Sequence, residues 1–389
     1  MPTPPIGETR PGAGPGNDGA GRGNDTAGPG NDGAGPGSGM AADIAEQPAV
    51  FARLLEPAQA DGIARVAAAI ARRRPRHVVF TARGTSDHAA LYAAYLTEIR
   101  LGLPAGLASP SAITLFGARP DLSQALVVGV SQSGGSPDLA EVLRAARASG
   151  ALTLAVTNAP GSPLDEVAEL SIDIAAGHER AVAATKTYTA ELLALLMLVE
   201  GVRSGDGALP ADERAALGAL PDLAAGVLAD PAAVELAPRY RFANQMITTG
   251  RGYAYPTARE AALKLMETSY LPALAFSGAD LLHGPLAMAD PDVPVLAVVG
   301  AGPGGAAMRD VLTRLGERRA DLVTIGPRTG DQAAEGSPGT RRLAVPAVDE
   351  RHTPLLDILP LQRLALALAL HRGEDPDAPR GLRKITATL

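Results

Sequence analysis

Two stretches of the chain repeat the same alternation of apolar runs and amphipathic segments. The first begins with a short apolar run at 78–80, passes through a loop at 81–84 and enters an Ala-rich segment that reaches Thr97. The second begins with a similar run at Met246 and leads into an amphipathic segment over 257–268. Short apolar runs bounded by turn residues predict strands, and helical periodicity predicts helices. The pattern therefore predicts an internal repeat of strand and helix.

Each copy continues with two further apolar runs separated by a helical segment. These runs are apolar on both faces, which is typical of parallel strands covered by helices on both sides of a sheet. The sequence therefore predicts an α/β fold of two tandem domains, each a parallel sheet flanked by helices. The further strands are expected at 125–130, 152–157, 294–299 and 322–325, and the helices between them at 138–149 and 306–318.

The segments outside the repeat set the expected domain boundaries. Residues 1–39 contain 13 glycines and 7 prolines, a composition that cannot bury a core, so we expect a disordered tail there. The first domain is expected over 40–220 and the second over 221–375, where an apolar helix at 355–370 closes the fold. A C-terminal tail over 376–389 follows, and it is expected to complete the functional site.

Composition and charge exclude several classes of protein. The 389 residues include no cysteine, which leaves no disulfide framework, no Cys-ligated metal and no Cys nucleophile. A net charge of −7 argues against a general nucleic-acid binder, because a phosphate backbone requires a basic surface. Apolar runs such as 192–199 are too short for a membrane span, and the N-terminus lacks a signal pattern. We expect a soluble cytoplasmic protein with neither a nucleic-acid nor a membrane partner.

Lysine is rare among the 35 basic residues, of which only Lys186, Lys264 and Lys384 are lysines. An ammonium group can lose its proton or form a Schiff base, whereas a guanidinium stays protonated. The three lysines could also be chance survivors in an Arg-rich chain. Their surroundings must decide between these interpretations.

A polar loop follows the strand at 125–130 and precedes a helix. Ligands of a parallel sheet bind beyond the carboxyl ends of its strands, and a helix N-terminus with hydroxyl groups makes a neutral anion cradle. The loop therefore predicts a phosphomonoester site, although a Ser-rich cap on an ordinary turn is the alternative. Its candidate ligands are Ser131, Gln132, Ser133 and Ser136. Further candidates at neighbouring loops are Thr85, Ser86, Thr185 and Lys186.

The helix at 257–268 carries Glu260, Lys264 and Glu267 at spacings that place them on one face. His283 follows within 20 residues, so a carboxylate, a lysine and a histidine could form a proton-transfer site. A solvent-exposed row of ion pairs is the alternative. His88, three residues after Thr85, is interpreted as a residue that caps or packs in a helix, and we assign it no catalytic or binding role.

One motif is interpreted as a structural turn. Residues 300–305 match the G-x-G-x-x-G dinucleotide fingerprint between a strand and a helix. However, Pro303 removes a backbone N–H from the loop, and Asp321 precedes its strand instead of ending it. We therefore expect a Gly-rich turn without a dinucleotide.

Taken together, these residues resemble the sugar isomerase (SIS) family over 43–389. The sequence is similar to the isomerase half of glucosamine-6-phosphate synthase and to stand-alone deaminases of the SIS type. The matching segments are 84–86, 131–134, 184–186, 260–270, 283–286 and 379–384, and all three lysines fall within them.

The resemblance implies a role for each candidate residue. The hydroxyl and amide side chains of the polar loops would hold a sugar phosphate. Glu267 would move a proton between C1 and C2 with support from Lys264, and His283 would assist ring opening. Lys384 would approach the carbonyl carbon. The same resemblance implies a homodimer and requires no metal or redox cofactor.

Two departures from the synthase pattern favour the deaminase branch. The sequence has no cysteine for a glutaminase nucleophile, and residues 136–138 read Ser-Pro-Asp where synthases usually carry Glu-Thr. Ala184 replaces a serine found in synthases. We therefore expect an amino-sugar-phosphate deaminase/isomerase that converts glucosamine 6-phosphate to fructose 6-phosphate and ammonia. The alternatives are a synthase-type isomerase with a separate ammonia source, an enzyme for fructosamine or galactosamine phosphates, and a non-catalytic sugar-phosphate sensor.

Overall fold

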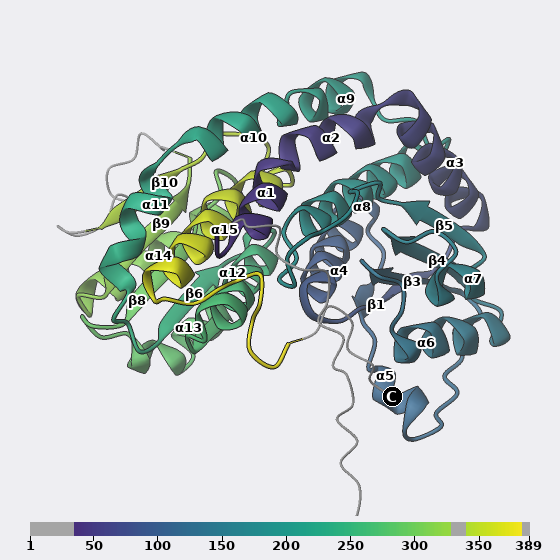
Figure 1. Cartoon of the computed structure of the whole chain (residues 1–389). Coiled ribbons are helices and arrows are strands. Elements are labelled where there is room, and N and C mark those ends of the chain that lie inside the picture. The colour runs from purple at the N-terminus through teal and green to yellow at the C-terminus, as the bar shows by residue number, and fades with distance from the viewer. Residues whose placement is uncertain (1–34, 328–339, 383–389) are drawn as a thin grey trace, which may run out of the picture. The chain divides into compact units, whose positions relative to one another are not determined.

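Two five-stranded parallel sheets form the framework of the protein. The computed structural model describes residues 35–327 and 340–382 (Figure 1). The strand orders are β2-β1-β3-β4-β5 and β10-β9-β8-β6-β7, and every pairing is parallel. The expected α/β fold with two tandem parallel sheets is confirmed. The first sheet holds β1 (His77–Thr81), β2 (Ala105–Leu107), β3 (Ala125–Ser131), β4 (Leu152–Thr157) and β5 (Leu170–Asp173). The second holds β6 (Met246–Gly250), β7 (Ala273–Ser277), β8 (Pro294–Val298), β9 (Asp321–Gly326) and β10 (Arg341–Ala344).

The internal repeat appears as one topology used twice. When β1 is matched with β6 and the later strands follow in order, both sheets have the doubly wound order 2-1-3-4-5. In this order the chain reverses its direction of winding between the first and third strands, and ligands bind in the crevice beyond that point. The switch points of the two domains therefore lie between β1 and β3 and between β6 and β8.

Helices cover both faces of the first sheet, as the burial of its central strands requires. All seven residues of β3 and all six of β4 are buried. The N-terminal helices are α1 (Ser38–Ala45), α2 (Gln47–Leu55) and α3 (Pro57–Arg73). The helices within the domain are α4 (Gly84–Leu96), η1 (Thr97–Leu101), α5 (Pro110–Thr114), α6 (Pro137–Ala148), α7 (Pro163–Val167) and α8 (Lys186–Ser204).

The second domain is reached through a series of short helices that begin at or near prolines, where the missing N–H is tolerated. These connecting helices are α9 (Ala211–Gly218), α10 (Leu220–Ala229), α11 (Ala232–Leu236) and η2 (Ala237–Tyr240). The helices of the second domain are α12 (Ala254–Ser269), α13 (Gly278–Leu282), η3 (Pro285–Met288), α14 (Pro303–Glu317) and α15 (Thr353–His371).

One cluster of buried side chains spans both domains, and each domain has a further cluster of its own. Val130 of β3, Leu196 of α8, Leu296 of β8 and Leu361 of α15 belong to the same cluster of buried side chains. Helix α12 contacts both α4 and α15, so a helix of the second domain lies directly against the helix that follows β1 (Figure 1). This contact brings side chains of the second domain to the switch point of the first.

The described part of the C-terminal tail is anchored at two places. The carboxylate of Asp377 accepts hydrogen bonds from the backbone N–H groups of Gly39 and Met40 at the start of α1. Backbone N–H of Arg380 donates to the Tyr270 hydroxyl at 2.6 Å, and the guanidinium of Arg380 lies 3.9 Å from the centre of the Tyr270 ring. The tail therefore joins the start of α1 to the end of α12.

Two segments are long and apolar enough to cross a membrane by length and composition. They are Ala211–Tyr240 and Thr353–His371. In Thr353–His371, 83% of the most apolar window is buried inside the protein, which is the property of a core helix. Ala211–Tyr240 consists of α9, α10, α11 and η2, which are separate short helices.

Candidate active site

The loop after β3 folds around its own hydroxyl groups. Ser131 Oγ accepts a hydrogen bond from Gly134 N at 3.1 Å, and Ser133 Oγ accepts one from Gly135 N at 3.3 Å. Gly134 has a φ of 59°, and a Cβ at this position would overlap the side chain of Ser162. Glycine is therefore required here by both the backbone conformation and the close approach of a neighbouring loop.

At the start of α6, the side chain of Ser136 is available to bind a ligand. Ser136 is the N-cap residue of α6, but its side chain makes no capping hydrogen bond. Gln132, Ser133 and Ser136 are half-buried, whereas Ser131 is 7% exposed. The structure thus places the predicted ligands Ser131, Gln132, Ser133 and Ser136 together at the helix N-terminus, where an anion would be stabilised.

Arg83 and Asp138 brace the same loop from two sides. The guanidinium of Arg83 lies 2.7 Å from the carboxylate of Asp138, which is 1% exposed and sits in the first turn of α6. Arg83 precedes α4 and half of its side chain is exposed. The ion pair ties the loop after β1 to the loop after β3, which are the two loops of the switch point.

A buried cluster of charged side chains connects α12 to the start of α4. Thr85 Oγ1 donates a hydrogen bond to Glu260 Oε1 at 3.1 Å, and Lys264 Nζ donates to Thr85 Oγ1 at 3.0 Å. Lys264 Nζ also lies 3.3 Å from Glu260 and 2.5 Å from Glu267. His88 Nδ1 lies 2.7 Å from the second oxygen of Glu260. The cluster is assembled from both domains, since Thr85 and His88 belong to α4.

The electrostatics of this cluster keep Lys264 charged. Burial by itself would lower the pKa of Lys264, but the carboxylates of Glu260 and Glu267 outweigh burial and raise that pKa above its usual value. Glu260 and Lys264 are fully buried, whereas the Glu267 side chain is 23% exposed. Glu267 is therefore the acid of this row that reaches the surface. Lys264, which stays protonated, forms an ion pair with it.

His88 is the residue that the sequence left without a role and that the structure places in the cluster. Its ring is 9% exposed, and its contact with Glu260 joins α4 to α12. The spacing of three residues from Thr85 puts both side chains on one face of α4. That signal becomes informative only once α4 is known to pack against α12.

Ser86 contacts a buried acid on α8. Its Oγ lies 2.7 Å from Glu191 Oε1, and both residues are buried. Burial raises the pKa of Glu191 to about 8. The hydrogen bond with Ser86 opposes this rise, and the negative charges of Glu260 and Glu179 add to it. Glu191 Oε2 has no hydrogen-bond partner among the described residues.

Thr185 and Lys186 occupy a separate polar cluster at the start of α8. Glu179 accepts hydrogen bonds from the N–H and hydroxyl groups of Thr185 and from Lys186 N. Lys186 Nζ lies 3.0 Å from Asp43 and 2.5 Å from Glu46, both on or next to α1. Lys186 is 1% exposed, so its ammonium is already compensated by these two acids. A substrate contact of either Thr185 or Lys186 stays a prediction.

The two remaining candidates are His283 and Lys384. His283 is exposed at the C-cap of α13, and none of the hydrogen bonds or ion pairs in the described part of the chain involves its ring. Lys384 lies outside the described residues. Their predicted roles in ring opening and carbonyl attack stay predictions.

The second domain presents a different loop at its own switch point. Residues 300–305 follow β8 and lead into α14, as the loop after β3 leads into α6. Glu350 Oε1 accepts a hydrogen bond from Gly305 N at 3.0 Å. A Cβ on Gly300, Gly302 or Gly304 would collide with or crowd the Glu350 side chain. The Gly-rich turn expected from the sequence is therefore occupied by a carboxylate of the same chain.

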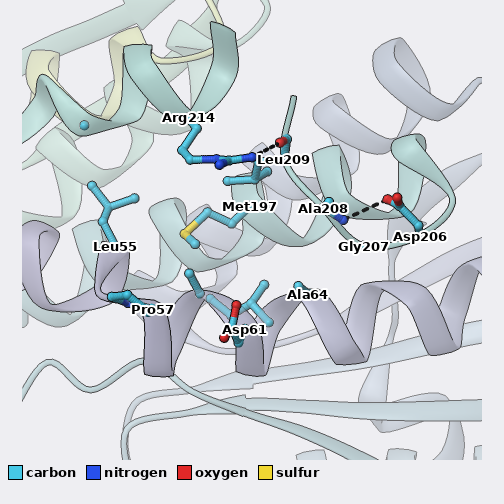
Figure 2. A pocket seen from close by; sticks show the side chains of 13 residues that line it. Leu55, Pro57, Asp61, Ala64, Met197, Asp206, Gly207, Ala208, Leu209 and Arg214 are labelled. Carbon is cyan, nitrogen blue, oxygen red and sulfur yellow. Dashed lines mark hydrogen bonds between the residues drawn. The ribbon is translucent and has the colours of Figure 1, made fainter. Parts of the chain in front are cut away.

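A cavity of about 500 Å³ lies away from these residues, between α3 and the segment that joins α8 to α9 (Figure 2). Figure 2 shows the Arg214 side chain bonded to the backbone oxygen of Leu209 and the Asp61 side chain of α3 at the cavity wall. None of the candidate site residues lines this cavity. It is separate from the charged cluster.

Comparison with known proteins identifies the repeat. The SIS domain family model matches residues 73–201 and 240–372, one match for each sheet. The chain is 35% identical over 356 residues to glutamine--fructose-6-phosphate aminotransferase [isomerizing] of Gloeobacter violaceus, covering 89% of this chain and 58% of that protein. An enzyme of the same name from Thermus thermophilus is 35% identical over 357 residues, with the same coverage. The chain thus spans a little over half the length of these relatives.

Solved structures of proteins named as sugar-phosphate enzymes have a similar fold. A protein from Silicibacter pomeroyi named as a phosphosugar isomerase is 36% identical, with a TM-score of 0.76, and the match covers 87% of this chain and 99% of that chain. The C-terminal domain of glucosamine-fructose-6-phosphate aminotransferase from Francisella tularensis is 27% identical, with a TM-score of 0.81, covering 88% and 98% of the two chains.

Proposed function

Because the chain belongs to the SIS domain family, we propose that it is a sugar-phosphate isomerase acting on an amino-sugar phosphate. Its reaction is the conversion of glucosamine 6-phosphate to fructose 6-phosphate and ammonia. The observation that carries this proposal is the row of Glu260, Lys264 and Glu267, which is held against Thr85 at the switch point of the first domain. A partly exposed carboxylate beside a buried cation suits repeated uptake and release of a proton.

In the proposed reaction the sugar phosphate is held at the loop after β3, and its ring opens to the aldehyde. Glu267 takes the proton from C2, which the neighbouring carbonyl and amine groups make acidic, and returns a proton to C1. This transfer, together with the movement of one N–H proton to O1, gives the imine of fructose 6-phosphate. Water then adds to the imine carbon, and the C–N bond breaks to release ammonia and the ketose. Lys264 holds the Glu267 carboxyl group in place between these proton transfers.

The choice of a deaminase rests on the phosphate loop. Asp138 of the Ser-Pro-Asp sequence is fully used by Arg83 and by the backbone of α6, so this departure from the synthase pattern is built into the switch point. The Silicibacter pomeroyi protein named as a phosphosugar isomerase supports an isomerase activity, since the match covers 87% of this chain and 99% of that chain. A homodimer remains a prediction from the family resemblance, and a cytoplasmic location remains a prediction from composition and sequence pattern.

A synthase-type isomerase is the second candidate function, because the curated relatives named above are aminotransferases. In that case fructose 6-phosphate and ammonia from a separate source would be the physiological substrates. The same proton transfer between C1 and C2 serves both directions, so the residue roles are unchanged.

The test is a panel of sugar phosphates given to the purified protein. We expect ammonia and fructose 6-phosphate from glucosamine 6-phosphate, measured by coupled assays for both products. Faster formation of glucosamine 6-phosphate from fructose 6-phosphate and ammonium would favour the synthase-type isomerase. Turnover of a galactosamine or fructosamine phosphate alone would identify that compound as the substrate in place of glucosamine 6-phosphate. Binding without turnover of any member of the panel would indicate a sensor.

A further inference from the structure

Glu191 is a buried acid that forms a hydrogen bond with Ser86. It lies on α8 and is 1% exposed, and its Oε1 is 2.7 Å from Ser86 Oγ. Its other oxygen has no hydrogen-bond partner among the described residues, and in that part of the chain no basic side chain forms an ion pair with it. An ionised carboxylate with neither a cation nor a full set of donors is costly to bury.

The charged groups around Glu191 also disfavour a negative charge. From α12 it faces Glu260 and from the segment before α8 it faces Glu179, and both are acids. Tyr188, its neighbour on α8, is neutral because burial raises its pKa well above the usual value. The Lys264 ammonium and the His88 ring contact Glu260 instead. Burial with these two acids raises the pKa of Glu191 to about 8, so the group is a neutral carboxylic acid at pH 7.

The protonation state of Glu191 decides which partner donates in its bond with Ser86. A carboxylate can only accept, so an ionised Glu191 would use the hydroxyl hydrogen of Ser86. A carboxylic acid can donate, so a protonated Glu191 gives its own hydrogen to Ser86 Oγ and leaves the Ser86 hydrogen free. A serine that already accepts one hydrogen bond can donate its hydrogen to another acceptor.

We propose that Glu191 is a positioning residue that, as a neutral acid, donates to Ser86 and thereby makes the Ser86 hydroxyl a donor for the substrate phosphate. The inference rests on the proposed function in one respect, namely the assignment of Ser86 as a contact of the sugar phosphate. It adds a dependence of substrate affinity on pH. Above about pH 8 Glu191 loses its proton, Ser86 turns toward it, and the phosphate loses a donor and gains a nearby negative charge.

The experiment measures the dissociation constant of fructose 6-phosphate, and of inorganic phosphate, by calorimetry between about pH 6.5 and pH 9.5. The second ionisation of a phosphomonoester is complete well below pH 8, since its pKa is about 6. We expect wild-type affinity to fall about tenfold or more above pH 8, the size of a lost hydrogen bond to a charged group. Glu191→Gln keeps a neutral donor at every pH, so it should match the wild type at pH 7 and lose the alkaline fall.

Two further variants complete the test. Ser86→Ala should bind weakly at all pH values and show no alkaline fall. Asp357→Asn is the matched control, because Asp357 is another fully buried carboxyl whose pKa burial raises and whose oxygens lack partners among the described residues. Asp357 is not among the candidate ligands, so Asp357→Asn should keep the alkaline fall.

A thermal unfolding series provides a measurement without ligand. Because the folded pKa of Glu191 is raised, its contribution to stability is present at low pH and is lost as pH rises toward about 8. The melting temperature of Glu191→Gln relative to the wild type should therefore increase from about pH 5 to pH 8 and then level off.

Several results would overturn the inference. A flat wild-type affinity across the pH range would do so, as would an unchanged alkaline fall in Glu191→Gln. A loss of binding in Glu191→Gln at pH 7 as large as that of Ser86→Ala would show that the ionised form is needed. None of these readouts requires turnover, so a failure to release ammonia from glucosamine 6-phosphate would leave them unaffected.

Discussion

The two domains share a strand order but differ at the place where a doubly wound sheet binds its ligand. In the first domain, half-buried hydroxyl and amide groups surround the start of α6 and their loop is braced by Arg83. In the second domain, a loop of glycines at the start of α14 encloses the carboxylate of Glu350. The fold supplies the same anion-stabilising helix N-terminus twice, and side chains decide whether it is open or filled.

This difference explains why two domains make one candidate site. The second domain contributes α12, whose acids and lysine reach the switch point of the first domain through Thr85. Its own switch point is closed by Glu350 from the segment before α15. In the proposed reaction, the first domain would supply the cradle for the phosphate, and the second would supply the groups for proton transfer.

The largest expected effect tests this division of labour at Glu267. Glu267→Gln keeps the shape of the side chain and removes the base, so kcat should fall by about 10²- to 10⁴-fold, the usual contribution of a general base. The dissociation constant of fructose 6-phosphate should change little, because the proposed phosphate loop belongs to the other domain. Steady-state kinetics and calorimetry check the two halves of the prediction, and a variant with nearly normal kcat would remove Glu267 from its proposed role.

The next effect compares glycines in the two loops. Gly134→Ala introduces a Cβ that overlaps Ser162 at a positive φ, so the serine loop must move and sugar-phosphate affinity should fall by about tenfold, one lost charged hydrogen bond. Gly302→Ala crowds Glu350 in the second domain and should lower the melting temperature while leaving affinity unchanged. Equal losses of affinity in both variants would contradict the idea that only the first loop holds substrate.

Two buried histidine–glutamate pairs allow a similar comparison. His88 contacts Glu260 in the charged cluster, whereas His352 Nε2 lies 2.8 Å from Glu213, next to the segment that carries Glu350. His88→Ala frees Glu260 to shift from Lys264, so we expect kcat to fall several-fold with little change in KM. His352→Ala should destabilise the fold but keep kcat. His88→Asn, which retains an N–H donor near the position of Nδ1, should recover most of the lost activity. Its failure to do so would indicate that ring packing matters more than the hydrogen bond.

Much of this arrangement follows from sequence patterns, and the part that does not has a physical reason. The central strands β1, β3, β4, β6, β8 and β9 were predictable because both faces are apolar, and the structure confirms them within a few residues. The edge strands β2, β5, β7 and β10 were not predicted, because they carry exposed or polar residues and all but β7 have only three or four residues. Edge pairing depends on neighbouring strands more than on local composition.

The candidate site was also predictable from the sequence only in part. The serine loop and the acidic row of α12 were predictable from spacing along one element. The contacts of His88 with Glu260 and of Ser86 with Glu191 join residues more than 100 positions apart, so no local pattern reveals them. Likewise, the sequence predicts a Gly-rich turn at 300–305, but Glu350 as its occupant requires the fold.

The smallest expected effect concerns Glu350 itself. A carboxylate at a helix N-terminus contributes about 1 kcal/mol, so Glu350→Ala should lower the melting temperature by about 2 °C in a chain of this size. Glu350→Gln, which still offers an acceptor oxygen to Gly305 N, should lose less. Neither variant should alter kcat or the affinity for fructose 6-phosphate, since the filled loop is separate from both the proposed phosphate loop and the acidic row of α12. If Glu350→Ala instead lowered sugar-phosphate affinity without changing stability, the second loop would have to be a substrate site, and the contrast between the two domains would fail.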